Sequence, residues 1–225
     1  MPGLIALVGG NEFRPDCEPM DRTLLARAGR APRVVILPTA AARENPDLAA
    51  RNGVRYFERL GARAEAAWVV DPASASEPKW ASLVKDADLI YFAGGDPLYL
   101  LQTLLHSPLW AASVEAWQGG RMLAGSSAGC MIFGGKMWSP GEGWTEGLGL
   151  LPGIAVIPHH ARLARRWKAE SMRKALPAGI RLIGVDESTA LVGPPWEVLG
   201  GGEVVVYEGR RPRHYRNGQG VEWSN

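Results

Sequence analysis

Short apolar segments recur along the chain, and most of them are apolar at every position rather than at every second one. They lie at residues 4–8, 34–37, 66–70, 89–93, 122–124, 154–157 and 182–185. A strand of this kind is buried on both faces, as in a parallel sheet that is covered by helices. The pattern therefore predicts a mostly parallel sheet in the interior of the protein.

Segments with helical spacing lie between the apolar runs. In two of them apolar side chains recur three or four positions apart, at Ala50, Val54, Phe57 and Leu60 and at Leu98, Leu101, Leu104 and Leu105. This spacing places the apolar side chains on one face of a helix. Alternating strands and helices are typical of an open, doubly wound sheet, so we expect a three-layer α/β/α fold.

The pattern changes near the C-terminal end. Three short runs with strand character, at residues 189–192, 196–199 and 203–207, are separated by Gly-Pro-Pro and Gly-Gly-Gly. Such separators are typical of tight turns between antiparallel strands. About 40 residues are too few for a stable separate domain. We therefore expect one domain over residues 1–225, in which residues 186–225 form a β-rich, antiparallel extension of the same sheet.

The composition is that of an ordinary globular protein, with 46% apolar and 21% charged residues among 225. The 25 basic and 23 acidic side chains give a formal net charge of +2. This near balance provides no strong field for nucleic acid or for an anionic membrane. We therefore expect neither of them as a partner.

The cysteines and the N-terminal segment favour a soluble, cytoplasmic protein. Cys17 and Cys130 are too few for a disulfide framework and match no metal-ligand spacing, so we expect a reducing compartment and no bound metal. The first apolar run has no basic segment before it, and no run approaches the roughly 18 apolar residues that span a bilayer. No Gly-x-Gly-x-x-Gly follows the first strand and no P-loop is present, so we expect no cofactor.

The sequence Gly-Ser-Ser-Ala-Gly at residues 125–129 is the most informative local pattern. It follows the buried run 122–124 and precedes a segment with helical character. This is the context of a nucleophile elbow, in which a Gly-x-Ser-x-Gly turn presents the central hydroxyl, here that of Ser127. The alternative is an ordinary turn in which Ser126 or Ser127 caps the following helix. We interpret Cys130, three residues further on, as a small core residue.

A catalytic serine needs a general base, and the chain contains the four histidines His106, His159, His160 and His214. His159 and His160 follow the buried run 154–157, with one proline between. Open α/β sheets place their sites beyond the carboxyl ends of the strands, so this pair supplies the candidate base. A histidine that is held by the backbone at a strand end is the structural alternative.

An acidic side chain at another strand end is expected to orient the histidine and to stabilise its charged form. Asp186 and Glu187 directly follow the run 182–185 and fit this position. Glu142 and Glu146, in the segment after the nucleophile, are rival acids. From the residues alone, the choice among these acids stays open.

Four blocks of the sequence resemble the serine peptidase family of aspartyl dipeptidase (peptidase E) and cyanophycinase. The first strand with its Gly-Gly turn is one block, and Gly-Ser-Ser-Ala-Gly resembles the family's Gly-Thr-Ser-Ala-Gly elbow. The other two are Tyr-Phe-Ala-Gly-Gly-Asp at residues 91–96 and Gly-Val-Asp-Glu-Ser-Thr-Ala-Leu at residues 184–191. The resemblance extends to about residue 192. It implies a fold similar to that of class I glutamine amidotransferases.

The resemblance also implies a role for particular residues. Ser127 is implied as the nucleophile, His159 as the base and Glu187 as the acid that orients the base. The backbone N–H groups of Gly95 and Ala128 are implied as the oxyanion hole. His160 stands where the family usually has Phe, which is a departure from its pattern.

The family members favour an aspartyl group on the acyl side of the cleaved bond, and a cation in the pocket would have to recognise it. Arg165, or else Arg162, is the candidate in the basic segment after the histidines. Asp96 and His160 are further candidate substrate contacts. The ordinary interpretation is that the arginines form a solvated helix surface and that Asp96 caps a helix.

The sequence therefore predicts a serine peptidase that acts on small peptide substrates through an acyl-enzyme, as a monomer or a homodimer. An esterase of the α/β-hydrolase type is the second hypothesis, with Ser127, Asp186 and His214 in the chain order of that class. A flavodoxin-like binder of a small anion, without catalysis, is the third. It would use the loops at residues 9–12 and 94–96.

Overall fold

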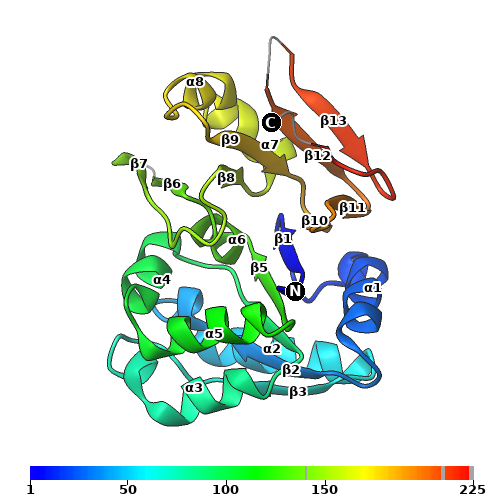
Figure 1. Ribbon diagram of the computed structural model, residues 1–225, viewed down its shortest axis with the longest axis vertical. Helices are drawn as coiled ribbons and strands as arrows, with labels where there is room; N and C mark the ends of the chain where they lie inside the picture. Colours follow the sequence, from blue (N-terminus) through cyan, green and yellow to red (C-terminus); the bar gives the residue numbers. More distant parts are fainter. Residues whose placement is uncertain (140, 209–210, 223–225) are drawn as a thin grey trace.

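The computed structural model describes residues 1–139, 141–208 and 211–222 (Figure 1). The helices are α1 (Glu18–Ala28), α2 (Pro46–Arg59), α3 (Pro78–Lys85), α4 (Pro97–Leu104), α5 (Pro108–Gln118), α6 (Ala128–Ile132), α7 (His160–Arg166) and α8 (Ala169–Lys174). The strands are β1 (Ile5–Val8), β2 (Arg33–Leu37), β3 (Arg63–Ala66), β4 (Leu89–Phe92), β5 (Met122–Ser126), β6 (Lys136–Ser139), β7 (Gly143–Glu146), β8 (Ile154–Ile157), β9 (Arg181–Val185), β10 (Thr189–Gly193), β11 (Glu197–Gly200), β12 (Glu203–Tyr207) and β13 (Arg213–Arg216).

A seven-stranded sheet forms the centre of the larger part of the molecule. Its strand order is β11-β10-β1-β5-β4-β2-β3. The five strands from β1 to β3 in this order run parallel, whereas β10 and β11 are antiparallel. The predicted three-layer, mostly parallel sheet with antiparallel strands near the C-terminus is confirmed.

Both faces of this sheet are buried at its central strands, which explains why β1 and β4 are apolar at every position. Ile5 and Leu7 of β1 belong to a hydrophobic cluster with residues of α3, α4 and α5. Ala6 and Val8, on the opposite face, pack in a second cluster with residues of α1 and α2. Consecutive side chains of a strand point to opposite faces, so each apolar run fills two cores at once.

A second sheet lies above the first in Figure 1, with strand order β13-β12-β9-β8. The predicted runs 154–157 and 182–185 are strands, but they pair with each other here and not within the seven-stranded sheet. The prediction of one extended sheet is therefore wrong for β12 and β13, since β12 pairs with β9. The three glycines at residues 200–202 carry the chain from β11 in the first sheet to β12 in the second.

The second sheet has its own apolar cover. Ala155 and Ile157 of β8 and Leu182 of β9 pack against residues of α7 and α8 in a third cluster. Val156 and Ile183 lie on the other face of the second sheet. They belong to the hydrophobic cluster that also contains Ile5 and Leu7 of β1. The two sheets therefore meet through a continuous apolar interface, and the carboxyl ends of β8 and β9 are held near those of β1 and β5.

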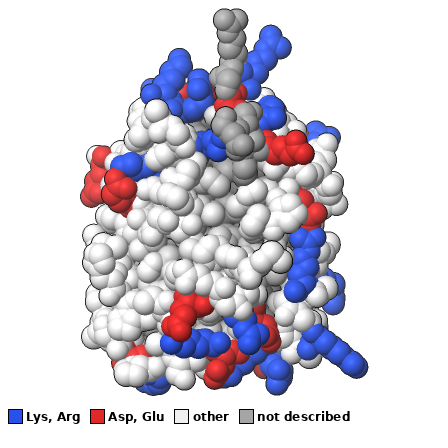
Figure 2. Space-filling model, viewed as in Figure 1, with Lys and Arg blue, Asp and Glu red and all other residues white. Residues whose placement is uncertain are grey.

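Charged side chains of both signs lie around the edge of the face shown in Figure 2, at its top and bottom and along its sides, and few lie in its middle. In the described parts of the chain, no helix is both long enough and apolar enough to cross a membrane.

One carboxyl group is enclosed between α1 and α2. Asp21 is fully buried and accepts a hydrogen bond from the Tyr56 hydroxyl at 2.7 Å. Its other oxygen, Oδ1, has no hydrogen-bond partner among the described residues. Burial, together with the nearby charge of Glu12, outweighs the hydrogen bond from Tyr56 and raises the pKa of Asp21 from 3.8 to about 7.

We expect Asp21→Asn to stabilise the protein at pH 8 relative to the wild type. A raised folded-state pKa means that ionisation of Asp21 weakens the folded state progressively as the pH rises past 3.8, and fully above about 7. The asparagine carries no charge at any pH. Urea unfolding should show the difference in free energy of unfolding growing by on the order of 4 kcal/mol in favour of the variant between pH 4 and pH 8.

Asp16→Asn is the matched control, because Asp16 is an exposed aspartate close to α1. Because its side chain is exposed, we expect this substitution to change the free energy of unfolding by less than about 0.5 kcal/mol. A difference between Asp21→Asn and the wild type that does not change with pH would show that Asp21 titrates alike in the folded and unfolded chains.

Candidate active site

Ser127 lies in a sharp turn between β5 and α6, with φ 49° and ψ −110°. Its backbone N–H donates to the carbonyl of Val8 in β1 at 3.0 Å, which fixes the turn to the sheet. The two glycines of the pattern pack against each other, since a Cβ atom at Gly125 would lie 2.4 Å from the carbonyl carbon of Gly129. Small residues at both positions are therefore a condition for the turn that presents the Ser127 side chain.

His159 is positioned by the segment after β1. It follows β8 in a left-handed conformation, and its N–H donates to the carbonyl of Gly9 at 2.7 Å. Its ring lies over Gly10, where a Cβ atom would be only 2.2 Å from Cε1. Gly10 itself has a φ of +125°, a region that glycine adopts without strain. The Gly-Gly turn thus provides both the backbone anchor and the space for the imidazole.

The three residues implied by the family resemblance are in hydrogen-bond contact. His159 Nε2 is 3.0 Å from Ser127 Oγ, and His159 Nδ1 is 2.6 Å from Glu187 Oε1. Glu187 follows β9. Its carboxylate accepts a hydrogen bond from Nδ1–H, which leaves Nε2 to accept the Ser127 hydroxyl proton. This is the geometry that converts a serine into a nucleophile.

Two backbone N–H groups beside Ser127 are free to bind an oxyanion. In the described chain, neither Gly95 N nor Ala128 N donates a hydrogen bond. Ala128 directly follows Ser127, and Gly95 lines the same cleft as Ser127 and His159. Free amides at this place are what stabilisation of a tetrahedral intermediate requires.

Two clefts meet at His159. The first has a volume of about 380 Å³ and contains Ser127, Gly95, Arg14 and Glu44 in its wall. The second, about 720 Å³, lies on the Glu187 side of the ring and includes Arg162. Since Ser127 lines only the first, a reacting carbonyl group has to enter there.

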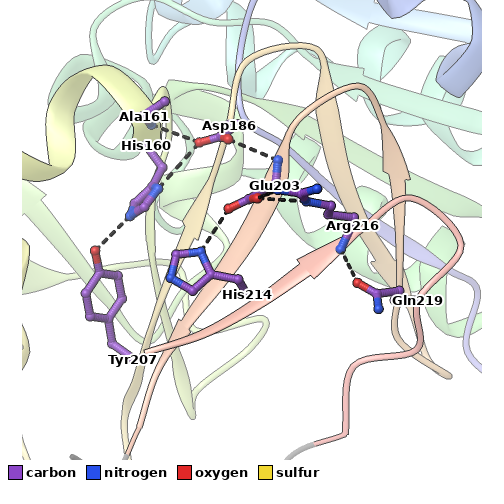
Figure 3. A network of polar contacts seen from close by, with 8 residues as sticks. All are labelled: His160, Ala161, Asp186, Glu203, Tyr207, His214, Arg216 and Gln219. Atoms are coloured by element: carbon purple, nitrogen blue, oxygen red, sulfur yellow. Dashed lines mark hydrogen bonds and ion pairs between the residues drawn. The ribbon is translucent and has the colours of Figure 1, made fainter. Parts of the chain in front are cut away.

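His160, the neighbour of the candidate base, belongs to a network of polar contacts with Tyr207 and Asp186 (Figure 3). Its Nε2 is 2.7 Å from the Tyr207 hydroxyl, and its Nδ1 is 3.4 Å from Asp186 Oδ1. Burial raises the pKa of Tyr207 to about 12, so this hydroxyl stays protonated and is able to donate to His160 Nε2. The contacts of His160 thus hold α7 against β9 and β12.

Asp186 belongs to the same network. Its carboxylate accepts from the N–H of Ala161 at 2.8 Å and from the N–H of Glu203 at 3.0 Å. Burial alone would raise the pKa of Asp186, but the hydrogen bonds from His160 and from these two amides outweigh it and lower the pKa below its usual value. Asp186 is therefore a carboxylate that joins α7 to β12.

The structure does not assemble the alternative set of Ser127, Asp186 and His214. His214, on β13, contacts Glu203 through Nδ1 at 2.8 Å, and its side chain is 57% exposed (Figure 3). The loops at residues 9–12 and 94–96 do meet, but the Gly94 N–H already binds the Glu12 carboxylate. This N–H group is therefore already engaged and is not available to a small-anion ligand.

The other candidates from the sequence lie apart from the reacting atoms. Asp96 caps α4 by accepting from the N–H groups of Leu98 and Tyr99, both at 3.0 Å. Arg162 is 3.2 Å from Glu187, whereas the exposed Arg165 lines neither of the two clefts. Glu142 is exposed in the hairpin of β6 and β7, and Glu146 pairs there with Lys136. Within the described residues, no three His, Cys, Asp or Glu side chains are grouped to hold a metal ion.

Residues 4–193 match the peptidase family S51. The chain belongs to this family. The solved structure of a peptidase from an acI-B1 Actinobacterium is 35% identical, with a TM-score of 0.89 over 99% of this chain and 98% of that one. A protein described as a peptidase E from Listeria monocytogenes EGD-e shares the fold, with a TM-score of 0.64 and 17% identity over 96% of this chain and 99% of that one.

Cyanophycinases from Synechococcus elongatus and Thermosynechococcus vestitus are each 30% identical over 134 residues, which are 59% of this chain. The match spans only 41% of the length of these two relatives. Membership of the S51 family supports a serine-type peptidase, and the predicted resemblance to this family is confirmed. The roles of the individual site residues stay predictions.

Two further residues line the first cleft, and the sequence predicts no role in a peptidase site for either of them. Glu12 and Arg14 follow the Gly-Gly turn, and both line the cleft that contains Ser127. The local sequence after the first strand carries no pattern that singles them out. Their proximity to Gly94 and Ser127 depends on the packing of β1 beside β5.

Alanine variants of His159, His160 and His214 test which histidine is the base. We expect His159→Ala to lower kcat/KM on a peptide substrate by roughly 10³-fold or more, as loss of a triad member does. His214→Ala should remain close to the wild type, since among the described residues its exposed ring has a polar contact with Glu203 alone. His160→Ala should fall between them, because it loosens α7.

Thermal unfolding of each variant provides the control for folding. An inactive His214→Ala together with an active His159→Ala would contradict the assignment of the base.

Proposed function

We propose that this member of the S51 family is a serine peptidase that hydrolyses short peptides through an acyl-enzyme on Ser127. The observation that carries the proposal is the chain of two hydrogen bonds from Ser127 Oγ through His159 to Glu187, at 3.0 and 2.6 Å. The two free N–H groups of Gly95 and Ala128 support it.

In the proposed mechanism His159 Nε2 accepts the hydroxyl proton as Ser127 Oγ attacks the carbonyl carbon of the scissile bond. The carbonyl oxygen becomes an oxyanion and accepts hydrogen bonds from the N–H groups of Gly95 and Ala128. His159 then gives its proton to the leaving amine, and the peptide C–N bond breaks. Water, deprotonated by His159, attacks the carbonyl carbon of the acyl-enzyme. The bond from this carbon to Ser127 Oγ then breaks as His159 returns the proton to Oγ, which releases the acid and restores the enzyme. Glu187 holds the imidazole throughout.

The size of the cleft favours short substrates. Its volume of about 380 Å³ is at the small end for ligand sites, which is suited to one or two amino-acid residues. Its lining includes the polar side chains of Arg14, Asn45 and Asn52, together with those of Glu12 and Glu44.

We further propose that the acyl residue is acidic and that Arg14 recognises it. Arg14 is exposed, lines the cleft with Ser127 and has no ion-pair partner in the described part of the chain. Arg162 is engaged with Glu187, and Arg165 lies outside both clefts. A guanidinium group binds a carboxylate through two parallel hydrogen bonds, so Arg14 would select an aspartyl or glutamyl group.

A panel of Asp-X, β-aspartyl and Ala-X dipeptides, with simple esters beside them, tests the proposal on the wild type and on single variants. We expect Asp-X to be hydrolysed fastest and Ser127→Ala to lose about 10⁴-fold or more while remaining folded. Arg14→Gln should lower kcat/KM for Asp-X by about 10- to 100-fold relative to Ala-X, the worth of a charge-assisted hydrogen bond. Arg162→Gln and Arg165→Gln should keep the wild-type preference for Asp-X over Ala-X.

Arg51→Gln, on the exposed side of α2, is the control for removal of a positive charge. Hydrolysis of esters with no peptide cleaved would contradict the peptidase. Loss of the Asp-X preference in Arg162→Gln or Arg165→Gln, with Arg14→Gln unchanged, would move the recognition site to the other side of His159.

A further inference from the structure

Glu12 has no role in the mechanism above, yet its carboxylate binds two separate segments of the site. Oε1 accepts from the backbone N–H of Gly94 at 2.7 Å, and Oε2 accepts from the hydroxyl of Ser126 at 2.8 Å. Both partners are distant in sequence, separated from Glu12 by 82 and 114 positions. One side chain therefore joins the loop after β4 to the end of β5.

Each of these partners immediately precedes a residue that the mechanism uses. Gly94 precedes Gly95, whose N–H is one half of the oxyanion hole, and Ser126 precedes the nucleophile Ser127. The fit is tight, because a Cβ atom at Gly94 would lie 2.7 Å from Glu12 Oε1 and 3.1 Å from the Cβ of Ser127. The carboxylate thus fills the space between the two loops.

The same segment also anchors the other half of the site. The carbonyl of Gly9 accepts from the N–H of His159 at 2.7 Å, and that of Gly10 accepts from the N–H of Ser188, next to Glu187, at 3.0 Å. Glu12 adds the contacts with Gly94 and Ser126, which lie on the side of the nucleophile. Residues 9–12 consequently contact the segments of the nucleophile, the base, the acid and the oxyanion hole.

We propose that Glu12 is a positioning residue that fixes the oxyanion-hole loop at Gly95 relative to Ser127. The proposal rests on the proposed function, since it takes Ser127 as the nucleophile and Gly95 as an oxyanion donor. A donor stabilises an oxyanion only at a separation of 2.7–3.1 Å, so release of the loop reduces stabilisation of the transition state more than binding of the substrate.

Two conservative variants separate the reach of the side chain from its charge. Glu12→Gln keeps the length, and its carboxamide can accept from Gly94 N–H and donate to the Ser126 oxygen. Glu12→Asp keeps the charge, but it is one methylene shorter and cannot span both loops. We expect Glu12→Gln to keep kcat within about fivefold and Glu12→Asp to lower it roughly 100-fold, as loss of one oxyanion donor does, with KM within about threefold.

A second readout does not depend on activity. Amide hydrogen exchange followed by NMR should show the Gly94 N–H protected in the wild type and in Glu12→Gln and exchanging faster in Glu12→Asp. Glu58→Ala, an exposed glutamate on α2, is the control for loss of an acidic side chain and should behave as the wild type.

The outcomes are distinct. Wild-type kcat and wild-type Gly94 protection in Glu12→Asp, in an enzyme that Ser127→Ala inactivates, would overturn the positioning role alone. An active Glu12→Asp beside an inactive Glu12→Gln would also overturn it, because charge and not reach would then matter. A change confined to KM would assign Glu12 to substrate binding instead. If Ser127→Ala remained active, the proposed function would have failed, and the positioning role with it.

Discussion

The short segment after β1 is the constraint on which the rest of the site depends. Its carbonyl groups bind the backbone of His159 and of Ser188, and Gly10 leaves room for the imidazole ring. The parallel pairing of β1 with β5 then places the same segment beside the nucleophile turn. A site assembled on the end of a buried strand is held by the core of the sheet, which is how a hydrogen-bond chain through three distant residues keeps its geometry.

The junction of the two sheets explains why neighbouring residues have different tasks. His159 and His160 are adjacent, but one contacts Ser127 and the other contacts Tyr207. Asp186 and Glu187 diverge in the same way, because Asp186 binds the amides of Ala161 and Glu203. His159 and Glu187 contribute to the candidate active site. His160 and Asp186 instead attach α7 to β12.

Much of this could be predicted from the sequence, because burial of strands on both faces and the glycine spacing of the elbow are local signals. The run 66–70 shows the limit of such signals, since β3 ends at Ala66 although Ala67 and Val69 are fully buried. An apolar run in the sequence indicates that its side chains are buried, but it does not indicate whether its backbone pairs with another strand. The contact of Glu12 with Gly94 arises only from the order of strands, so no local pattern reports it.

The central claim is that Ser127, activated by His159, is the reacting nucleophile. The most direct measurement is fragmentation mass spectrometry of the protein after reaction with an organophosphonate that labels activated serines. The account predicts a single label on Ser127 in the wild type and almost none in His159→Ala. A label on Ser126 or on a serine outside the elbow, or equal labelling of Ser127 in His159→Ala, would contradict it.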